Sequence, residues 1–379
     1  MKKLFCLFAT ICCISGFTFA QLKSDEHYLL AGTYTTGKSE GIYVYKFNSQ
    51  TGEFTAVSTA KGVSNPSYLT VSPDEKYVYA VNENHNKEQT GGEISSFSFD
   101  KKTGTLAFLN KQPSAGNDPC YVSITKSGKF VLVGNYSSGT AAVLPVKKDG
   151  SLDAAVSVIQ HEGSSVNSDR QEGPHVHSTV LSKDNKYVFI SDLGIDKIMI
   201  YQFDNKTGKL TAAATPYVEV EPGAGPRHFE FHPNNKFAYL IEELTGGISV
   251  FAYKGNGQLD LVQNISALPP DFVGQFTSAD IHISADGKFL YASNRDASNT
   301  IGIFSINQQS GELTLAGHQS TLGKTPRNFN LDPSGNFLLV ANQNSDDIVI
   351  FKRDKQTGLL TDTGKKIEIG NPVCIKWIE

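Results

Sequence analysis

Residues 223–247, GAGPRHFEFHPNNKFAYLIEELTGG, combine side chains that can bind an anion and transfer a proton. The segment holds an Arg-His pair, Arg227 and His228, and a Glu-Glu pair, Glu242 and Glu243. A guanidinium binds carboxylate or phosphate through its planar fork, and a carboxylate or imidazole can take a proton from water. These residue types indicate chemistry on an anionic substrate, provided that the fold brings the two pairs together.

The local sequence predicts a hairpin that does so. FEFHP is typical of a short strand, NNK of a turn, and FAYLIEEL of a second strand rich in β-branched and aromatic residues. Antiparallel neighbours run in opposite directions, so the start of the first strand and the end of the second lie at the same end of the hairpin. We therefore expect Arg227 and Glu243 to meet at one rim.

The chain repeats a second turn signature, of the Asp/Asn/Lys-x-Thr-Gly type, in which Gly supplies a positive φ. Its seven copies are NSQTGEF (48–54), DKKTGTL (100–106), KKDGSL (147–152), DNKTGKL (204–210), KGNGQL (254–259), NQQSGEL (307–313) and DKQTGLL (354–360). An alternating strand such as GIYVYKF or DIVIFKR precedes these turns, and a further hairpin lies between successive copies. Four antiparallel strands in about 50 residues are typical of a β-propeller blade.

The sequence therefore predicts an all-β, seven-bladed β-propeller with four antiparallel strands per blade. YLLAGTY and GIYVYKF near the N-terminus provide outer strands of the last blade, and NPVCIKWIE at the C-terminus provides its innermost strand. A blade shared by the two ends closes the ring and removes an exposed sheet edge. An all-β sandwich is the competing fold, but it needs fewer strands and no sevenfold repeat.

Alignment of the blades places the polar residues in two rings, both expected at one mouth of the central channel. The first ring, at the start of each innermost strand, is Ser67, Cys120, His177, Arg227, Ala279, Arg327 and Val373. The second ring, at the end of each second strand, is Tyr34, Glu83, Tyr136, Leu193, Glu243, Arg295 and Gln343. His175, His228 and Glu242 are sequence neighbours of ring members and are expected to extend the cluster.

Each candidate also has a simpler explanation. Arg227, Arg295 and Arg327 can be surface arginines in weak ion pairs, but their equivalent positions on nearby blades favour a converging anion site. Glu243 either neutralises Arg227 or acts as a catalytic or substrate-orienting carboxylate. His177, in GPHVHS, belongs to a His-x-His pattern that can bind metal. No further ligand is evident, so we favour a general base or a hydrogen-bonding role for it.

The first twenty residues are typical of a cleaved secretory signal: Lys2 and Lys3, an apolar core, and Thr18-Phe19-Ala20 before Gln21. The predicted organisation is a signal peptide at 1–20 and one propeller domain at 21–379. Loss of the two lysines changes the formal net charge from −4 to −6. An acidic surface argues against nucleic acid or an anionic membrane as a partner after cleavage. A retained membrane anchor is the alternative, although the apolar run is short for a span.

Three of the five cysteines lie in the predicted signal, so two, Cys120 and Cys374, remain after its cleavage. Two are too few for a disulfide framework, and we expect both as buried free thiols. The sequence has no nucleophile elbow, Walker loop, dinucleotide fingerprint or zinc-type helix motif. We therefore expect no cofactor, no metal and no covalent intermediate. A closed propeller has no obligatory interface, so we expect a monomer.

The segments that hold the candidate site residues resemble those of a known family. The segments GPHVHS, GPRHFEFHPNNKFAYLIEEL, ADIHISADGKFLYASNR and TPRNFNLDPSGNFLLVANQNSD are similar to the lactonase family of seven-bladed propellers. That family contains the propeller-type 6-phosphogluconolactonases and the carboxy-muconate cyclases. The resemblance extends from YLLAGTYT to the C-terminus and implies a metal-independent enzyme that opens or closes a lactone ring. It implies site residues at His177 (or His175), Arg227, Glu243 and Arg295.

The resulting hypothesis is an exported enzyme that hydrolyses a sugar lactone of the 6-phosphogluconolactone type. Glu243 or His177 would take a proton from water, while Arg227 and Arg295 would stabilise charge on the carbonyl oxygen. The anionic substituent would be held by Arg327, with His228. The export signal argues against a phosphorylated substrate more than against lactone chemistry.

The other expected substrate contacts are His175, Glu83 and Tyr136. Two other functions remain open. A cyclase or isomerase acting on a carboxylated, muconate-like acid could use the same arginines, and the fold also serves non-catalytic binding proteins.

Overall fold

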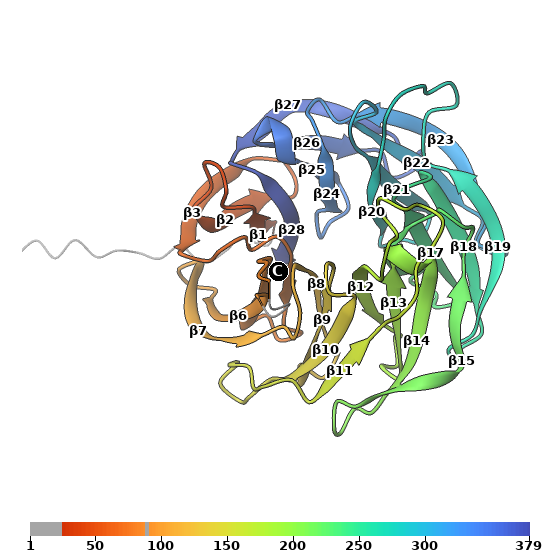
Figure 1. Cartoon of the computed structure of the whole chain (residues 1–379). Coiled ribbons are helices and arrows are strands. Elements are labelled where there is room, and N and C mark those ends of the chain that lie inside the picture. Colours follow the sequence, from red (N-terminus) through yellow and green to blue (C-terminus); the bar gives the residue numbers. More distant parts are fainter. Residues whose placement is uncertain (1–24, 88–90) are drawn as a thin grey trace, which may run out of the picture.

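The computed structural model describes residues 25–87 and 91–379. The signal peptide expected at residues 1–20 lies outside the described residues. In the described residues, 28 strands form seven four-stranded antiparallel sheets arranged around a central channel (Figure 1). The prediction of an all-β, seven-bladed propeller is confirmed.

The sheets contain the following strands, each sheet given from its innermost to its outermost strand. They are β4 (Leu69–Val71), β5 (Tyr77–Asn82), β6 (Glu93–Asp100), β7 (Thr105–Pro113); β8 (Pro119–Ile124), β9 (Phe130–Asn135), β10 (Thr140–Pro145), β11 (Ser157–Gln160); β12 (Val176–Leu181), β13 (Tyr187–Asp192), β14 (Lys197–Phe203), β15 (Leu210–Glu219); β16 (Pro226–Phe231), β17 (Phe237–Glu242), β18 (Gly247–Tyr253), β19 (Leu259–Ser266); β20 (Ser278–Ile283), β21 (Phe289–Asn294), β22 (Thr300–Ile306), β23 (Leu313–Ser320); β24 (Pro326–Leu331), β25 (Phe337–Asn342), β26 (Asp347–Arg353), β27 (Leu360–Glu368); and β28 (Pro372–Ile378), β1 (Glu26–Thr33), β2 (Gly41–Asn48), β3 (Phe54–Lys61). Two short 3₁₀ turns, η1 (Leu193–Ile195) and η2 (Gln343–Ser345), follow β13 and β25.

The two chain ends share the last sheet, as the sequence predicts. β28 pairs antiparallel with β1, where Leu29 lies opposite Trp377 and Ala31 opposite Ile375. The innermost strands β4, β8, β12, β16, β20, β24 and β28 each contact the next one, and β28 contacts β4, so the ring is closed. In Figure 1 the N-terminal strands, coloured red, lie beside the blue C-terminal strand.

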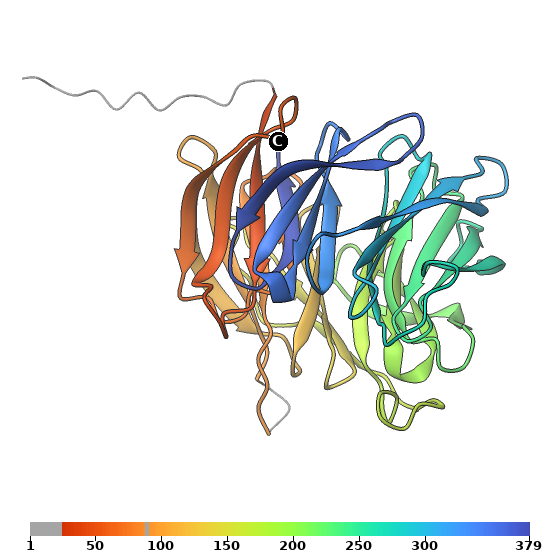
Figure 2. The same cartoon turned by 90° about the horizontal axis from the view of Figure 1, so that it is seen from above.

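Burial explains why the second strands are nearly continuous apolar runs. All six residues of β9, β17, β21 and β25 are buried, because neighbouring blades cover both faces of each sheet. The outermost strands alternate between exposed and partly buried residues, as expected for one covered face. Loops join the strands on both faces of the propeller (Figure 2).

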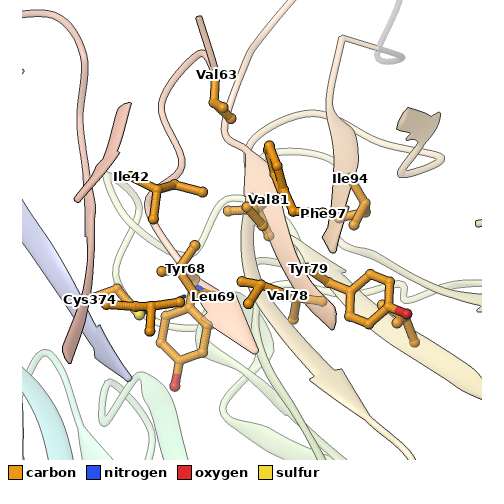
Figure 3. Close-up of a cluster of buried hydrophobic side chains, with 14 of the residues drawn as sticks. Ile42, Val63, Tyr68, Leu69, Val78, Tyr79, Val81, Ile94, Phe97 and Cys374 are labelled. Carbon is orange, nitrogen blue, oxygen red and sulfur yellow. Dashed lines mark hydrogen bonds between the residues drawn. The ribbon is translucent and has the colours of Figure 1, made fainter. Parts of the chain in front are cut away.

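Apolar side chains between adjacent blades form the core. One cluster spans the last blade and the first two, and Figure 3 shows part of it, with Cys374 beside Leu69. The backbone N–H of Leu69 donates to the Cys374 sulfur at 3.3 Å. Cys120 and Cys374 are buried free thiols, as predicted.

Candidate active site

A β-bulge at the start of most innermost strands positions the first ring. Pairing with the second strand shifts register across Cys120, His177, Arg227 and Arg327, which are left out of the ladder. A bulge leaves its extra residue unpaired and redirects that side chain. The same local irregularity, repeated from blade to blade, therefore turns these side chains toward one region of the channel.

A repeated backbone hydrogen bond positions the second ring. Each ring member directly follows its second strand, and its N–H donates to a carbonyl in the loop before the innermost strand. The donors and acceptors are Tyr34 and Asn371, Glu83 and Asn65, Tyr136 and Asp118, Leu193 and His175, Glu243 and Gly225, Arg295 and Thr277, and Gln343 and Thr325, at 2.8–3.1 Å. The two rings thus lie in register at the same end of the hairpins.

The rings enclose a cavity of about 500 Å³. Its lining combines guanidinium, carboxylate, imidazole, phenol and thiol groups. The lining residues are Tyr34, Glu83, Cys120, Tyr136, Arg170, His177, Glu243, Thr277, Arg295, Asp296 and Arg327. The chain has only five arginines; three line this cavity, and a fourth, Arg227, bonds to one of its carboxylates.

Glu243 organises the arginines. Its Oε2 accepts from Nε of Arg227 at 2.8 Å and forms an ion pair with Nη2 of Arg295 at 3.1 Å, while its Oε1 accepts from Nη2 of Arg170 at 2.6 Å. Burial alone would raise the pKa of Glu243, but the positive charges of Arg295, Arg227 and Arg170 hold that pKa well below its usual value. The carboxylate is therefore a fixed anion and a weak base.

Arg227 lies beneath the cavity and is 1% exposed. Besides Glu243, its guanidinium bonds through Nη1 to the Ala279 carbonyl oxygen at 2.5 Å and to Nε2 of His228 at 3.3 Å. The expected meeting of Arg227 and Glu243 is confirmed by their 2.8 Å contact. Arg227 thus acts on the cavity through the carboxylate that it holds.

His177 is a neutral imidazole in the cavity wall. Its Nε2 lies 3.9 Å from Oε2 of Glu243, and its Nδ1 lies 3.7 Å from the Cys120 sulfur. Burial, together with the positive charge of Arg227, lowers the pKa of His177 well below 6.5. Burial also raises the pKa of the Cys120 thiol, so the histidine, and not a thiolate, is the available base.

Glu83 occupies the opposite part of the wall. Its carboxylate accepts from the Tyr34 hydroxyl at 2.8 Å and from the Ser67 hydroxyl. The guanidinium carbon of Arg327 lies 5.6 Å from the centre of the Tyr34 ring. Both carboxylates of the two rings are therefore already hydrogen-bonded before any substrate binds.

Three residues expected to extend the cluster are turned away from the cavity. The expectation for Glu242 is wrong, because its carboxylate accepts from Thr245 and Ser249, each at 2.6 Å. His175 lies behind the wall, stacked on the Tyr136 ring with centroids 4.5 Å apart. His228 does not line this cavity but a second one further along the channel.

Sequence reasoning missed Arg170. It lies in the loop between β11 and β12, and its Nη2 donates to the Tyr136 hydroxyl at 3.1 Å as well as to Glu243. Buried Gln171 anchors the loop by donating to the Leu193 carbonyl oxygen at 2.9 Å and to Asp196 at 2.8 Å. Arg170 has no equivalent position in the repeat, so the ring alignment gave no signal for it.

Two further features concern metal binding and membrane insertion. Within residues 25–87 and 91–379, no group of three or more His, Cys, Asp or Glu side chains is arranged to hold a metal ion. Over the same residues, no helix is long and apolar enough to cross a membrane.

Comparison with known proteins identifies the family. The model of the seven-bladed β-propeller lactonases matches residues 28–377. The chain therefore belongs to the seven-bladed β-propeller lactonase family, and the resemblance inferred from the sequence is confirmed.

Individual relatives cover nearly the whole chain. The 6-phosphogluconolactonase of Bacillus subtilis is 37% identical over 92% of this chain and 97% of its own length. The 6-phosphogluconolactonase of Formosa agariphila is 41% identical over 88% of this chain and 94% of its own. The structure of the periplasmic gluconolactonase of Pseudomonas aeruginosa superposes with a TM-score of 0.89 at 40% identity, covering 93% and 99% of the two chains.

Proposed function

We propose that this protein hydrolyses sugar lactones of the gluconolactone type and binds them through an anionic substituent. Relatives named 6-phosphogluconolactonase and gluconolactonase support the reaction class. The proposal rests above all on the lack of a bonding partner for Arg327 in the part of the chain that the structure describes. Among the described residues, its guanidinium has no hydrogen bond and no ion pair, although it lines the cavity.

Arg327 is suited to the anionic end of the substrate. The nearby carboxylate of Glu83 is bonded by Tyr34 and Ser67, and Glu243 is held by the other arginines. The planar guanidinium can therefore offer two parallel N–H groups to a phosphate or a carboxylate. A 6-phosphate or the carboxylate of the acid product fits this chemistry.

His177 is the general base of the proposed reaction. It takes a proton from water, and the water oxygen attacks the lactone carbonyl carbon to form a tetrahedral intermediate. The ring C–O bond then breaks, and the imidazolium returns the proton to the departing ring oxygen. Glu243, 3.9 Å from His177, stabilises the imidazolium between these steps. Glu243 itself is the weaker candidate for the base, because Arg227, Arg295 and Arg170 already engage both of its oxygens.

Arg295 is the group best placed for the developing oxyanion. Its Nη2 is anchored by Glu243 and by the Ser278 carbonyl oxygen at 3.2 Å, which leaves other N–H groups of a cavity-lining guanidinium uncommitted. Prepositioned donors of this kind stabilise charge that appears only in the transition state.

A proton-release assay tests the proposal. The mature protein from Gln21 would be measured against 6-phosphogluconolactone, unphosphorylated gluconolactone and a carboxylated muconolactone, after subtraction of spontaneous hydrolysis. Arg295→Lys is expected to lower kcat by about 100-fold, the typical effect of losing one oxyanion donor. Arg353→Lys, the same change at an arginine outside the cavity, is the control. Inactivity of folded wild-type protein on all the lactones would reject the proposal.

We further propose that the protein is exported. The signal-like residues 1–20 and the periplasmic location in the name of the Pseudomonas relative support this. Fractionation of cells expressing the full chain, followed by mass measurement of the mature N-terminus, tests it. Cytoplasmic protein that retains Met1 would contradict export.

A further inference from the structure

A second cavity of about 370 Å³ lies further along the channel, past the layer of Arg227. It is lined by residues that follow the first ring on the innermost strands, among them Tyr121, His228, Glu230, Asp280 and His282. A much smaller space of about 10 Å³ separates the two cavities and is lined by residues of both, including Arg327 and His228. His228 is thus on the far side of the layer from the proposed substrate.

A chain of hydrogen bonds connects the layer to this second cavity. Nη1 of Arg227 lies 3.3 Å from Nε2 of His228, and Nδ1 of His228 lies 2.6 Å from Oδ1 of Asp280. Oδ2 of Asp280 lies 3.1 Å from Nε2 of His282, whose Nδ1 lies 3.0 Å from Oε2 of Glu230. Five titratable side chains from two innermost strands, β16 and β20, therefore form one continuous path.

The partners determine where the protons lie. His228 faces a carboxylate with Nδ1 and a guanidinium donor with Nε2, so it carries its proton on Nδ1 and accepts at Nε2. Burial and the charge of Arg227 lower the pKa of His228 to about 4. His282 faces carboxylates with both nitrogens; burial alone would lower its pKa, but Asp280 and Glu230 raise it to about 10. One histidine is neutral and the other is an imidazolium.

Asp280 is the fixed centre of the path. Its carboxylate also accepts from the Asn328 side-chain amide and from the backbone N–H of Ile281 at 3.0 Å, and the residue is 1% exposed. These donors come from two blades and hold the carboxylate in place. A fixed carboxylate in turn selects a single tautomer of His228.

We propose that Asp280 and His228 form a positioning pair for Arg227, and through Arg227 for Glu243 and the other arginines of the cavity. This inference rests on the proposed lactone hydrolysis. The guanidinium of Arg227 is held at Nε by Glu243 and at Nη1 by Ala279 and His228. Only the Nδ1-protonated tautomer of His228 offers the acceptor that completes this arrangement. His228 is therefore a positioning residue and not the substrate contact expected from the sequence.

Two substitutions at one site test the pair. In His228→Asn, the side-chain amide can still donate to Asp280 but ends short of Arg227. In His228→Gln, the longer side chain can place an acceptor near Arg227. We expect His228→Asn to lower kcat by about tenfold or more, since misplacing a catalytic constellation by an ångström is that costly. We expect His228→Gln to recover most of this loss, with KM within about twofold of wild type in both variants.

Other outcomes would overturn the proposal. A rise in KM at constant kcat would make His228 a substrate contact, and equal losses in both variants that follow their melting temperatures would make it purely structural. The tautomer can also be read without substrate from ¹⁵N NMR of histidine-labelled wild-type protein at neutral pH. We expect a neutral, Nδ1-protonated His228 beside a doubly protonated His282. An Nε2-protonated His228 would overturn the proposed positioning pair even if the protein is an active lactonase. Inactive wild-type protein with the expected tautomer would reject only the proposed function.

Discussion

At the scale of single residues, the cavity holds more positive charge than its ring carboxylates neutralise. Arg170, Arg227 and Arg295 converge on Glu243, at 2.6–3.1 Å. Arg327 is the guanidinium that finds no such partner among the described residues. Buried charges are stable only when they are paired, so an unpaired arginine in a cavity wall indicates a place for an anionic ligand.

Replacement of Arg327 tests this directly. Arg327→Gln is expected to raise KM for 6-phosphogluconolactone by about tenfold or more, because a charge-assisted hydrogen bond contributes about 1.5–3 kcal/mol. KM for the unphosphorylated lactone should change less, and kcat should change little for either. Arg353→Gln, measured by the same assay, is the control. An unchanged KM for the phosphorylated lactone would contradict the assignment.

The pH dependence of the reaction tests His177. Its pKa is lowered well below 6.5 by burial and by Arg227, so the imidazole is already the free base at neutral pH. After correction for spontaneous hydrolysis, kcat/KM should be flat between pH 6 and 8 and should fall only under more acidic conditions. An inflection near 6.5 would exclude this state of His177.

Substitution separates His177 from its neighbour. His177→Gln should lower kcat by about 100-fold or more, in the range expected for a general base. His175→Gln changes a histidine behind the wall and should have a much smaller effect. Equal losses in the two variants would place the base elsewhere.

At the scale of the secondary-structure elements, two local devices recur around the ring: a bulge at most innermost strands and a Gly-containing turn in every blade. The bulges turn ring residues toward the channel, and the Gly-containing turns join each blade to the one before it. The seven turn glycines have φ between 68° and 84°, a region that L-residues rarely adopt. The Gly150 turn also carries an acceptor, since the Tyr79 hydroxyl of the preceding blade donates to the Gly150 carbonyl oxygen at 3.1 Å.

Two glycines with nearly equal φ separate backbone strain from packing. A Cβ at Gly150, φ 83°, would lie 2.0 Å from the Tyr77 ring, whereas Gly255, φ 82°, has nothing within 4 Å. Gly255→Ala should cost about 1–2 kcal/mol through backbone strain alone. Gly150→Ala should cost roughly 1–3 kcal/mol more through overpacking. Urea unfolding measures both, and equal losses would show that the inter-blade contact is unimportant.

At the scale of the whole molecule, the ring is closed by pairing of the two chain ends. β28 is the innermost strand of the last blade, and it contacts β24 and β4 on its two sides. Closure covers the edge of β1, which would otherwise offer unpaired N–H and C=O groups to another chain. The cavity also depends on closure, because its lining comes from the strands and loops of all seven blades.

Deletion of residues 371–379 should therefore abolish the single cooperative unfolding transition and promote self-association. Deletion of Glu379 alone, beyond the end of β28, is the control. Light scattering and thermal unfolding measure the two effects. A truncated protein that remains monomeric and unfolds as the full chain does would contradict this role of β28.

The buried path beneath the active site makes stability depend on pH. The folded-state pKa of His282 is about 10, against a usual value of 6.5. Its contribution is therefore fully present below about pH 6.5 and is lost as pH rises through 10, since folding takes up about one proton in this window. His282→Gln should be less stable than wild type at pH 6, with the difference shrinking toward pH 10. A constant difference across that range would contradict the protonated state.

The sequence by itself determined the fold, the closing strand and most of the site. Turn glycines, strand alternation and hairpin spacing are local signals, and seven repetitions made their register reliable. Ring membership follows from strand register, so the sequence alone predicts that His177, Glu243, Arg295 and Arg327 lie at one cavity. The union of the two chain ends in one blade was predictable for the same reason.

Only the tertiary structure decided the remaining features. Arg170 comes from a loop outside the repeat, so no register could place it. Glu242 and His228 adjoin ring residues in the sequence, but the alternation of β-strands and the adjacent bulge turn their side chains away from the cavity. Asp280 acquires its role from donors on two other blades. Side-chain direction at a bulge and the proton positions of buried groups depend on contacts between blades, which local sequence does not encode.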